Sequence, residues 1–214
     1  TPNHFLHNWG QGLGIGARWS LTFDFWPLTT GLELMNWNPF RKKEETESID
    51  PLDITLDSLK PGYVLDYDLK TWQVSAHHYY EYDGDRVDEW ELSSADEVVY
   101  LECEKDDGVA YTLTRKIRVS EFDADIPAHI NQDEDPPEEI AYKGIVYEAD
   151  SSAIGRYYQN GEGTGDEFIV WDYLDDSEKR TLSIEQWSDD RFEASVGEIV
   201  EDYQFSNILP GEAT

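Results

Sequence analysis

The sequence predicts an all-β protein, and three observations support this class. Aromatic residues make up 14% of the 214 residues, and aromatic and β-branched residues favour strands. From residue 59 onward, apolar and polar residues alternate with a period of two, which is typical of half-buried strands. Asp, Gly and Ser turn signals interrupt this alternation about every ten residues, as in a meander, a small barrel or a sandwich.

The first predicted β half covers residues 59–132. It contains the alternating segments GYVLDYD, TWQVSAHHYYEYD, DEWEL, EVVYLECE and AYTLTRKIRV. In the second segment, five residues are expected to share one face: Trp72, Val74, Ala76, His78 and Tyr80. His77 then points to the opposite face. Cys103 alternates with Val99 and Leu101, so we expect it to be a small buried core residue and not a reactive thiol.

A break separates this half from a second one. Residues 126–130 predict a helix of one or two turns, and residues 133–140 predict an acidic, proline-containing hinge. The second β half, residues 141–210, contains YKGIVYEAD, GRYYQ, DEFIVWDYLD, KRTLSIEQW and EIVEDYQFSNIL. An Asp-Glu-aromatic sequence occurs at 88–90 and again at 166–168, and the other elements follow in the same order. We therefore expect two related β-rich halves, barrel-like or sandwich units that arose by internal duplication.

Two segments precede the predicted fold. Residues 1–34 carry almost no charge and stop just before the single methionine, Met35, so we expect a non-native or upstream segment without ordered structure. Residues 35–58 are expected to form a flexible leader and linker. Five of its residues suit a weak peripheral contact with an anionic membrane surface: Trp37, Phe40, Arg41, Lys42 and Lys43.

The charge balance restricts the classes of partner. Asp and Glu total 47 against 16 Lys and Arg, which gives a net charge of -31. Nucleic-acid binding needs a basic face toward the phosphates, so we expect no nucleic-acid partner. An acidic surface favours polyamines, metal ions or basic protein surfaces, and it also keeps a protein soluble without any partner. With one cysteine and no apolar run of about 20 residues, the expected location is the cytoplasm.

The acids supply the candidate binding residues. We expect the alternation to direct carboxylates to the solvent and rings and aliphatic groups to the core. Carboxylates beside aromatic rings suit an organic polycation, through ion pairs and cation–π contacts. The candidate ligand-binding residues are Glu89, Trp90, Glu91, Glu102, Glu104, Asp166, Glu167, Trp171 and Glu185. The sequence thus predicts a non-enzymatic binding or adaptor protein, with a polyamine as the candidate ligand.

Catalytic and metal motifs are weak. His77 and His78 are adjacent in a strand and point to opposite faces, so they cannot share one metal. His129 lies near Asp133 and Asp135, but the spacing matches no strong metal motif. We expect no metal and no cofactor, and we single out no catalytic residue. An enzyme with an unrecognised carboxylate pair stays open as an alternative, because no pair stands out among so many acids.

Segments of both halves resemble a known family. LKPGYVLDYDLKTWQV, DEWEL, VYLECEKDDG, GDEFIVWDYLD, LSIEQW and GEIVEDYQFSNILP are similar to the bacterial domain of unknown function 4178, over about residues 59–210. The resemblance implies no established catalytic residue. It implies a gene neighbourhood with polyamine-synthesis enzymes, small membrane proteins and phage-shock-type coat proteins. The alternative function is therefore an adaptor of membrane-stress machinery that docks through its N-terminal leader.

Overall fold

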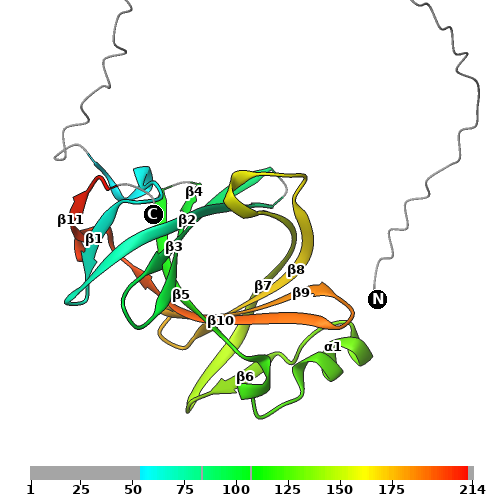
Figure 1. The fold of residues 1–214 in the computed structure, drawn as a ribbon. Helices are drawn as coiled ribbons and strands as arrows, with labels where there is room; N and C mark the ends of the chain where they lie inside the picture. Colours follow the sequence, from blue (N-terminus) through cyan, green and yellow to red (C-terminus); the bar gives the residue numbers. More distant parts are fainter. Residues whose placement is uncertain (1–53, 83, 107, 212–214) are drawn as a thin grey trace, which may run out of the picture. The chain divides into compact units, whose positions relative to one another are not determined.

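The computed structural model describes residues 54–82, 84–106 and 108–211. The predicted upstream segment 1–34 and the leader residues from Trp37 to Lys43 lie outside these ranges. Within them the chain forms eleven strands and one α-helix, which confirms the all-β class (Figure 1). No helix in this described part has the length and apolar character needed to cross a membrane.

The elements follow the chain in two series. The first series is η2 (Leu56–Ser58), β1 (Val64–Tyr67), β2 (Lys70–Tyr82), β3 (Asp85–Ser93), β4 (Val98–Lys105), β5 (Val109–Ile117), η3 (Val119–Glu121) and α1 (Ile126–Asp133). The second series is β6 (Glu139–Tyr142), β7 (Ile145–Tyr158), η4 (Gln159–Gly161), β8 (Asp166–Asp175), β9 (Arg180–Ser188), β10 (Arg191–Val200), η5 (Asp202–Gln204) and β11 (Ser206–Leu209).

The predicted helix is confirmed as α1, which starts at the predicted residue and ends at Asp133, beyond the predicted end at residue 130. Asp125 caps its start, because its side chain accepts a hydrogen bond from the amide of Ala128 at 3.2 Å. The helix ends at Asp133, and the C-cap residue Glu134 has a left-handed backbone conformation. The segment predicted as a hinge, residues 133–140, contains the end of α1, a short connection and the start of β6.

The eleven strands form one antiparallel sheet that closes on itself. Its order is β11-β1-β2-β3-β4-β5-β10-β9-β8-β7-β6. β2 also pairs with β7, with Tyr79 opposite Tyr158. The eight strands from β2 through β5 and β10 to β7 therefore make a closed ring, seen end-on in Figure 1. The two β-rich series share this ring, because β5 pairs with β10 and β2 with β7.

A bulge in β2 changes which residues share a face. The pairing of β2 with β3 shifts between Val74 and Ala76, so β2 has one extra residue there. Trp72 and Val74 pack in an apolar cluster on the outer side of the ring, whereas Tyr80 lines the interior. The prediction that the five alternating residues of this strand share one face was wrong, because an inserted residue reverses the alternation.

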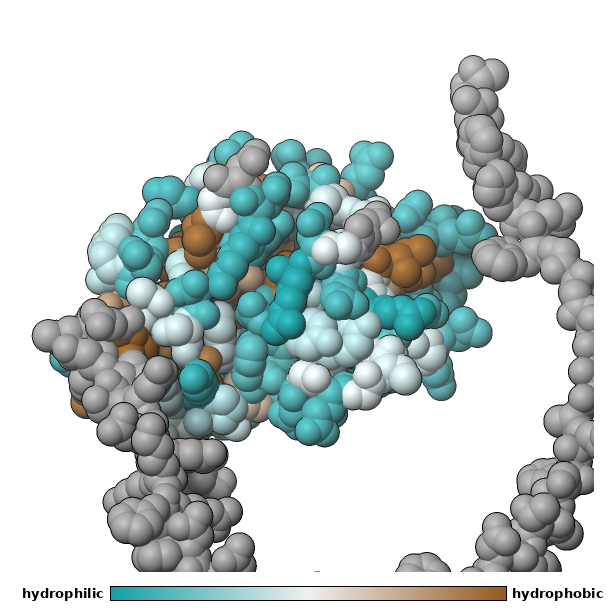
Figure 2. Space-filling view, turned by 90° about the horizontal axis from the view of Figure 1, so that it is seen from above, coloured by the Kyte–Doolittle hydropathy of each residue, from teal (hydrophilic) through white to brown (hydrophobic). Residues whose placement is uncertain are grey.

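Apolar side chains cover the outer side of the ring in two clusters. The first lies beneath η2, β1 and β11 and includes Leu65, Trp72, Trp90, Leu92, Leu101 and Cys103. The second lies beneath α1 and β6 and includes Ile126, Ile130, Trp171, Tyr173, Leu182 and Ile184. Cys103 is fully buried, which confirms its predicted core position. The short outer elements thus shield the apolar face that the ring strands turn outward, and the face shown in Figure 2 is mostly hydrophilic with small separate hydrophobic patches.

Candidate functional site

The closed ring surrounds a cavity of about 370 Å³ to which all eight ring strands contribute. This volume lies within the range of small-molecule sites. Six lining residues are acids, and none is Lys or Arg: the acids are Asp85, Glu102, Glu104, Asp150, Asp172 and Glu185. Three of them, Asp85, Glu104 and Asp150, are exposed. We call these three the mouth carboxylates, because they mark where the cavity opens to solvent.

Four carboxylates lie deeper: Glu89, Glu102, Asp172 and Glu185, the inner carboxylates. The expectation that acids face bulk solvent was wrong for this group. Glu89, for example, is only 2% exposed. The alternation itself is present, but the apolar face of each strand lies under the outer elements. Closure of the sheet then turns the opposite, polar face toward a shared interior.

Glu89 has partners for both of its oxygens. Its Oε2 accepts from the hydroxyl of Tyr80 at 3.0 Å, and its Oε1 accepts from the hydroxyl of Tyr157 at 3.3 Å. Burial raises the pKa of Glu89, while Lys116 and the two phenols partly offset that effect. The two rings lie 4.9 Å apart, and Tyr80 lines the cavity. Glu89 therefore holds both phenols in place, and each of its oxygens already accepts one protein hydrogen bond.

The carboxylates of Glu102 and Glu185 have fewer hydrogen-bond donors than that of Glu89. Oε1 of Glu102 accepts from Thr114 at 3.3 Å, and Oε2 of Glu185 accepts from the Trp187 indole at 3.1 Å. Within the described residues, the other oxygen of each side chain accepts no protein hydrogen bond. These two oxygens are available to donors that enter the cavity.

The electrostatics of the cavity disfavour several negative charges at once. Burial raises the pKa of Glu102 well above its usual value, and the charges of Glu89, Asp172 and Glu185 raise it further. Burial also raises the pKa of Glu185 to about 7, with Lys116 opposing the shift and Glu89 adding to it. Burial raises the pKa of Asp172, although Ser183 donates to its Oδ1 at 2.6 Å. A cation would relieve this mutual repulsion.

The structure brings together only part of the predicted site. Glu89, Glu102, Glu104 and Glu185 face the lumen. Glu91 lies on the same face of β3 as Glu89, but it accepts a hydrogen bond from Ser75 at 2.6 Å and does not line the cavity. The remaining predicted residues lie elsewhere: Trp90 and Trp171 in the two outer clusters, and Asp166 and Glu167 exposed at the start of β8.

Several lining residues were missed in the sequence. Tyr80 was assigned to the apolar face because the bulge in β2 was not recognised, and Asp172 was not singled out. Asp172 alternates with Val170 and Leu174, which line the same cavity, so the period-two pattern of this strand contained a usable signal. Lys116 was missed because its opposite neighbours lie on β10, far away in the sequence.

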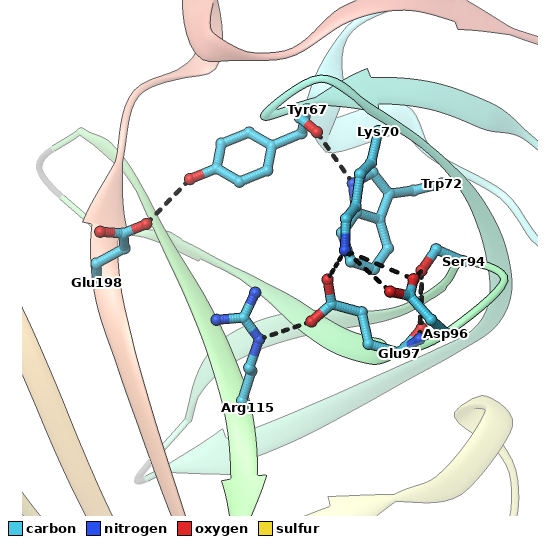
Figure 3. Close-up of polar contacts among 8 residues, drawn as sticks. All are labelled: Tyr67, Lys70, Trp72, Ser94, Asp96, Glu97, Arg115 and Glu198. Carbon is cyan, nitrogen blue, oxygen red and sulfur yellow. Dashed lines mark hydrogen bonds and ion pairs between the residues drawn. The ribbon is translucent and has the colours of Figure 1, made fainter. Parts of the chain in front are cut away.

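Two basic residues on the outer side of the ring, Lys70 and Arg115, have acidic partners. Lys70 binds Asp96 and Glu97, and Arg115 binds Glu97 at 3.2 Å (Figure 3). Trp72 donates its indole N–H to the carbonyl of Tyr67 in the same network. This network ties the β1–β2 turn to β5. It leaves Arg115 facing outward from β5, while its neighbour Lys116 faces the interior.

The three histidines of the predicted β region lie at three separate sites. His77 stacks on Trp90 at 5.2 Å, and the His78 ring accepts from the amide of Asn160 at 2.9 Å. His129 contacts the carbonyl of Asp135 at 2.8 Å. Within the described ranges, no group of three or more His, Cys, Asp or Glu residues is arranged to hold a metal ion.

Comparison with known proteins assigns the chain to a family. Residues 60–202 match the family described as domain of unknown function (DUF4178). The chain belongs to this family. It is also 28% identical over 171 residues to an uncharacterized protein of Aquifex aeolicus (strain VF5), a match that covers 80% of this chain and 94% of that protein. No solved structure matches the chain.

The inner carboxylates give this DUF4178 domain an expected pH dependence. A carboxyl group whose pKa is higher in the folded state contributes stability below its unfolded pKa and loses it as the pH rises through the folded pKa. For Glu185 this window runs from 4.5 to about 7. We expect the midpoint of thermal unfolding to rise as the pH is lowered through the upper part of this window.

Other titrating groups limit the range of this effect. His78 acts in the opposite direction, because burial lowers its pKa, but it is one group against four carboxylates. Burial opposes ionisation of Asp88, but hydrogen bonds from Arg86 and His77 lower its pKa overall. Ion-paired acids of this kind reduce the stability of the protein only at lower pH, where they become protonated. Differential scanning calorimetry across the pH range is the measurement. A midpoint that falls steadily from pH 8 to pH 6 would contradict the assignment of the inner carboxylates.

Proposed function

We propose that this protein binds a small organic cation inside the closed sheet, with a polyamine as the leading candidate ligand. One observation carries the proposal: a cavity of about 370 Å³ has six acids and no Lys or Arg in its lining. The candidate site thus moves from the outer surface of a sheet to an enclosed interior.

The chemistry of the lining supports an extended ammonium ligand. The second oxygens of Glu102 and Glu185 can accept from ammonium N–H groups, which form strong charge-assisted hydrogen bonds. Tyr80 and Tyr82 in the same lining offer ring faces for cation–π contact. The carboxylates come from different strands around the ring, which suits a ligand with several donors along its length better than one compact metal ion.

Calorimetric titration with spermidine tests the proposal. We expect saturable binding of one ligand per chain at low salt, and weaker binding at physiological salt because ions screen the mouth carboxylates. Propylamine, with one ammonium group, serves as the control and is expected to bind more weakly. Absence of heat, or heat equal to that from sodium chloride of the same ionic strength, would refute the proposal.

A second candidate is an enzyme that uses the same cavity. Its support is that Glu102 and Glu185 line one cavity and that the pKa of Glu185 is raised to about 7, a value suited to general acid–base catalysis. Mass spectrometry after incubation distinguishes the two candidates. A binding protein returns the amine unaltered, whereas an enzyme changes it.

The predicted internal duplication and the hinge are further proposals. The duplication is supported by bulges at corresponding places, between Val74 and Ala76 in β2 and between Ala149 and Ser151 in β7. Register also supports a duplication, but with Trp90 corresponding to Trp171 and not, as predicted, to Phe168. Trp90 lies opposite Leu101, the residue before Glu102, and Trp171 lies opposite Ile184, the residue before Glu185. The two carboxylates with an open oxygen would then occupy corresponding positions in the two halves.

The adaptor hypothesis involves a different part of the chain. Docking on membrane-stress machinery through Trp37, Phe40 and the basic residues that follow depends on residues outside the described ranges. Sedimentation with anionic vesicles, before and after removal of residues 1–50, tests it independently of the cavity.

A further inference from the structure

A second, much smaller hollow continues the main cavity toward the other end of the ring. It measures about 10 Å³, enough for roughly one water molecule. It shares five lining residues with the main cavity: Tyr80, Glu102, Thr114, Glu185 and Ser195. Its lining also includes Lys116 and Glu193. Lys116 is the single basic residue among the lining residues of both hollows.

Lys116 is held at this narrow end by specific contacts. Its Nζ donates to Oε2 of Glu193 at 2.7 Å and lies 5.3 Å from the centre of the Tyr100 ring. Burial opposes its charge, but the bond to Glu193 and the nearby carboxylates raise its pKa above the usual value. Its positive charge in turn lowers the pKa of Glu89 and Glu185. Lys116 thus places one ammonium group at the narrow end of the hollow, where 44% of its side chain is exposed to solvent.

We propose that Lys116 is a built-in cation that closes the narrow end of the cavity and limits the length and charge of the ligand. This inference rests on the proposed function. A ligand that enters past the mouth carboxylates meets Glu102 and Glu185 first and then a fixed like charge. A further ammonium group of the ligand can advance only into the place that Lys116 already occupies.

The spacing along β4 shows which ligands reach this limit. Glu102 and Glu104 are two residues apart on one strand face, a separation of about 7 Å. A short diamine can therefore place one ammonium group at the inner carboxylates and the other at the mouth. A longer polyamine has additional ammonium groups, and one that advances past Glu102 and Glu185 meets Lys116, which already pairs with Glu193 there.

The test compares putrescine with spermine in the full-length chain. The quantity measured by calorimetry is the ratio of the two affinities. In the wild type we expect this ratio to be close to one. In Lys116→Met we expect spermine to gain roughly tenfold or more relative to putrescine, because a carboxylate cluster without its resident cation accepts the additional ammonium group.

Two variants control for charge and position. Arg115→Met removes the same charge one residue away on the outer face, and Lys116→Arg keeps the charge in place; both are expected to keep the wild-type ratio. Lys116→Gln carries the same test if the Met variant does not fold, as judged by circular dichroism. An unchanged ratio in the neutral variants overturns the role of Lys116 alone. Absence of binding to the wild type and the variants overturns the proposed function as well.

Discussion

Replacing both Glu102 and Glu185 by Gln is expected to weaken spermidine binding by about tenfold or more and to stabilise the protein at the same time. The double variant removes the two carboxylates that have an oxygen without a protein donor. It therefore removes the charge-assisted hydrogen bonds that a bound ammonium would receive.

The gain in stability has a separate physical origin. Both carboxyl groups have raised pKa values because of burial and mutual repulsion, so keeping them ionised costs folding free energy. We expect the free energy of unfolding near pH 8 to rise by about 1–3 kcal/mol, with solvent in the cavity keeping the gain below the full desolvation cost. Denaturant unfolding near pH 8 and near pH 5.5 measures it, and the gain should shrink at the lower pH.

A matched control separates these effects from net charge. Glu139→Gln with Glu162→Gln removes the same number of charges from exposed positions. For this control we expect a spermidine affinity within about threefold of the wild-type value. We expect its free energy of unfolding to lie within about 0.5 kcal/mol of that of the wild type. If both double variants changed affinity and stability alike, the inner carboxylates would have no special role.

Replacing Trp90 by Ala is expected to reduce the free energy of unfolding by about 3–5 kcal/mol. Trp90 is 1% exposed in the outer cluster beneath η2, β1 and β11. Its indole N–H donates to the carbonyl of Leu59 at 3.0 Å, and the His77 ring stacks on it at 5.2 Å. Truncation thus opens a cavity and also leaves a buried carbonyl without its donor.

Denaturant unfolding followed by circular dichroism measures this loss. Tyr203→Ala is the control, because Tyr203 is an aromatic residue that is 79% exposed, and we expect a change within about 0.5 kcal/mol. Trp90→Phe restores most of the volume without the N–H group and should fall between the two. If Trp90→Ala reduced the free energy of unfolding no more than Tyr203→Ala, the packing of this cluster would not stabilise the contact between η2 and the ring.

The acidic segment around β3 and β4 shows which features of the fold and site can be predicted from the sequence and which cannot. Its alternation correctly identified two strands, and it placed Cys103 in the apolar core. It also placed Glu89, Glu102 and Glu104 together on one face. Because alternation is a local property of the strand, it does not predict whether the polar face contacts bulk solvent or the interior of a ring.

The sequence by itself determined the all-β class, the positions of α1 and of most strands, and the separation of carboxylates from the aliphatic and indole side chains. It did not place β10, most of which lies between two predicted segments, and it assigned the start of β6 to the hinge. Only the tertiary structure decided that both series of strands close into one ring, through the pairs β5–β10 and β2–β7. These pairings join residues far apart along the chain, and their register depends on bulges that local patterns do not reveal. Closure is what gathers Glu102, Asp172 and Glu185 from three different strands in one interior, where their charges repel one another.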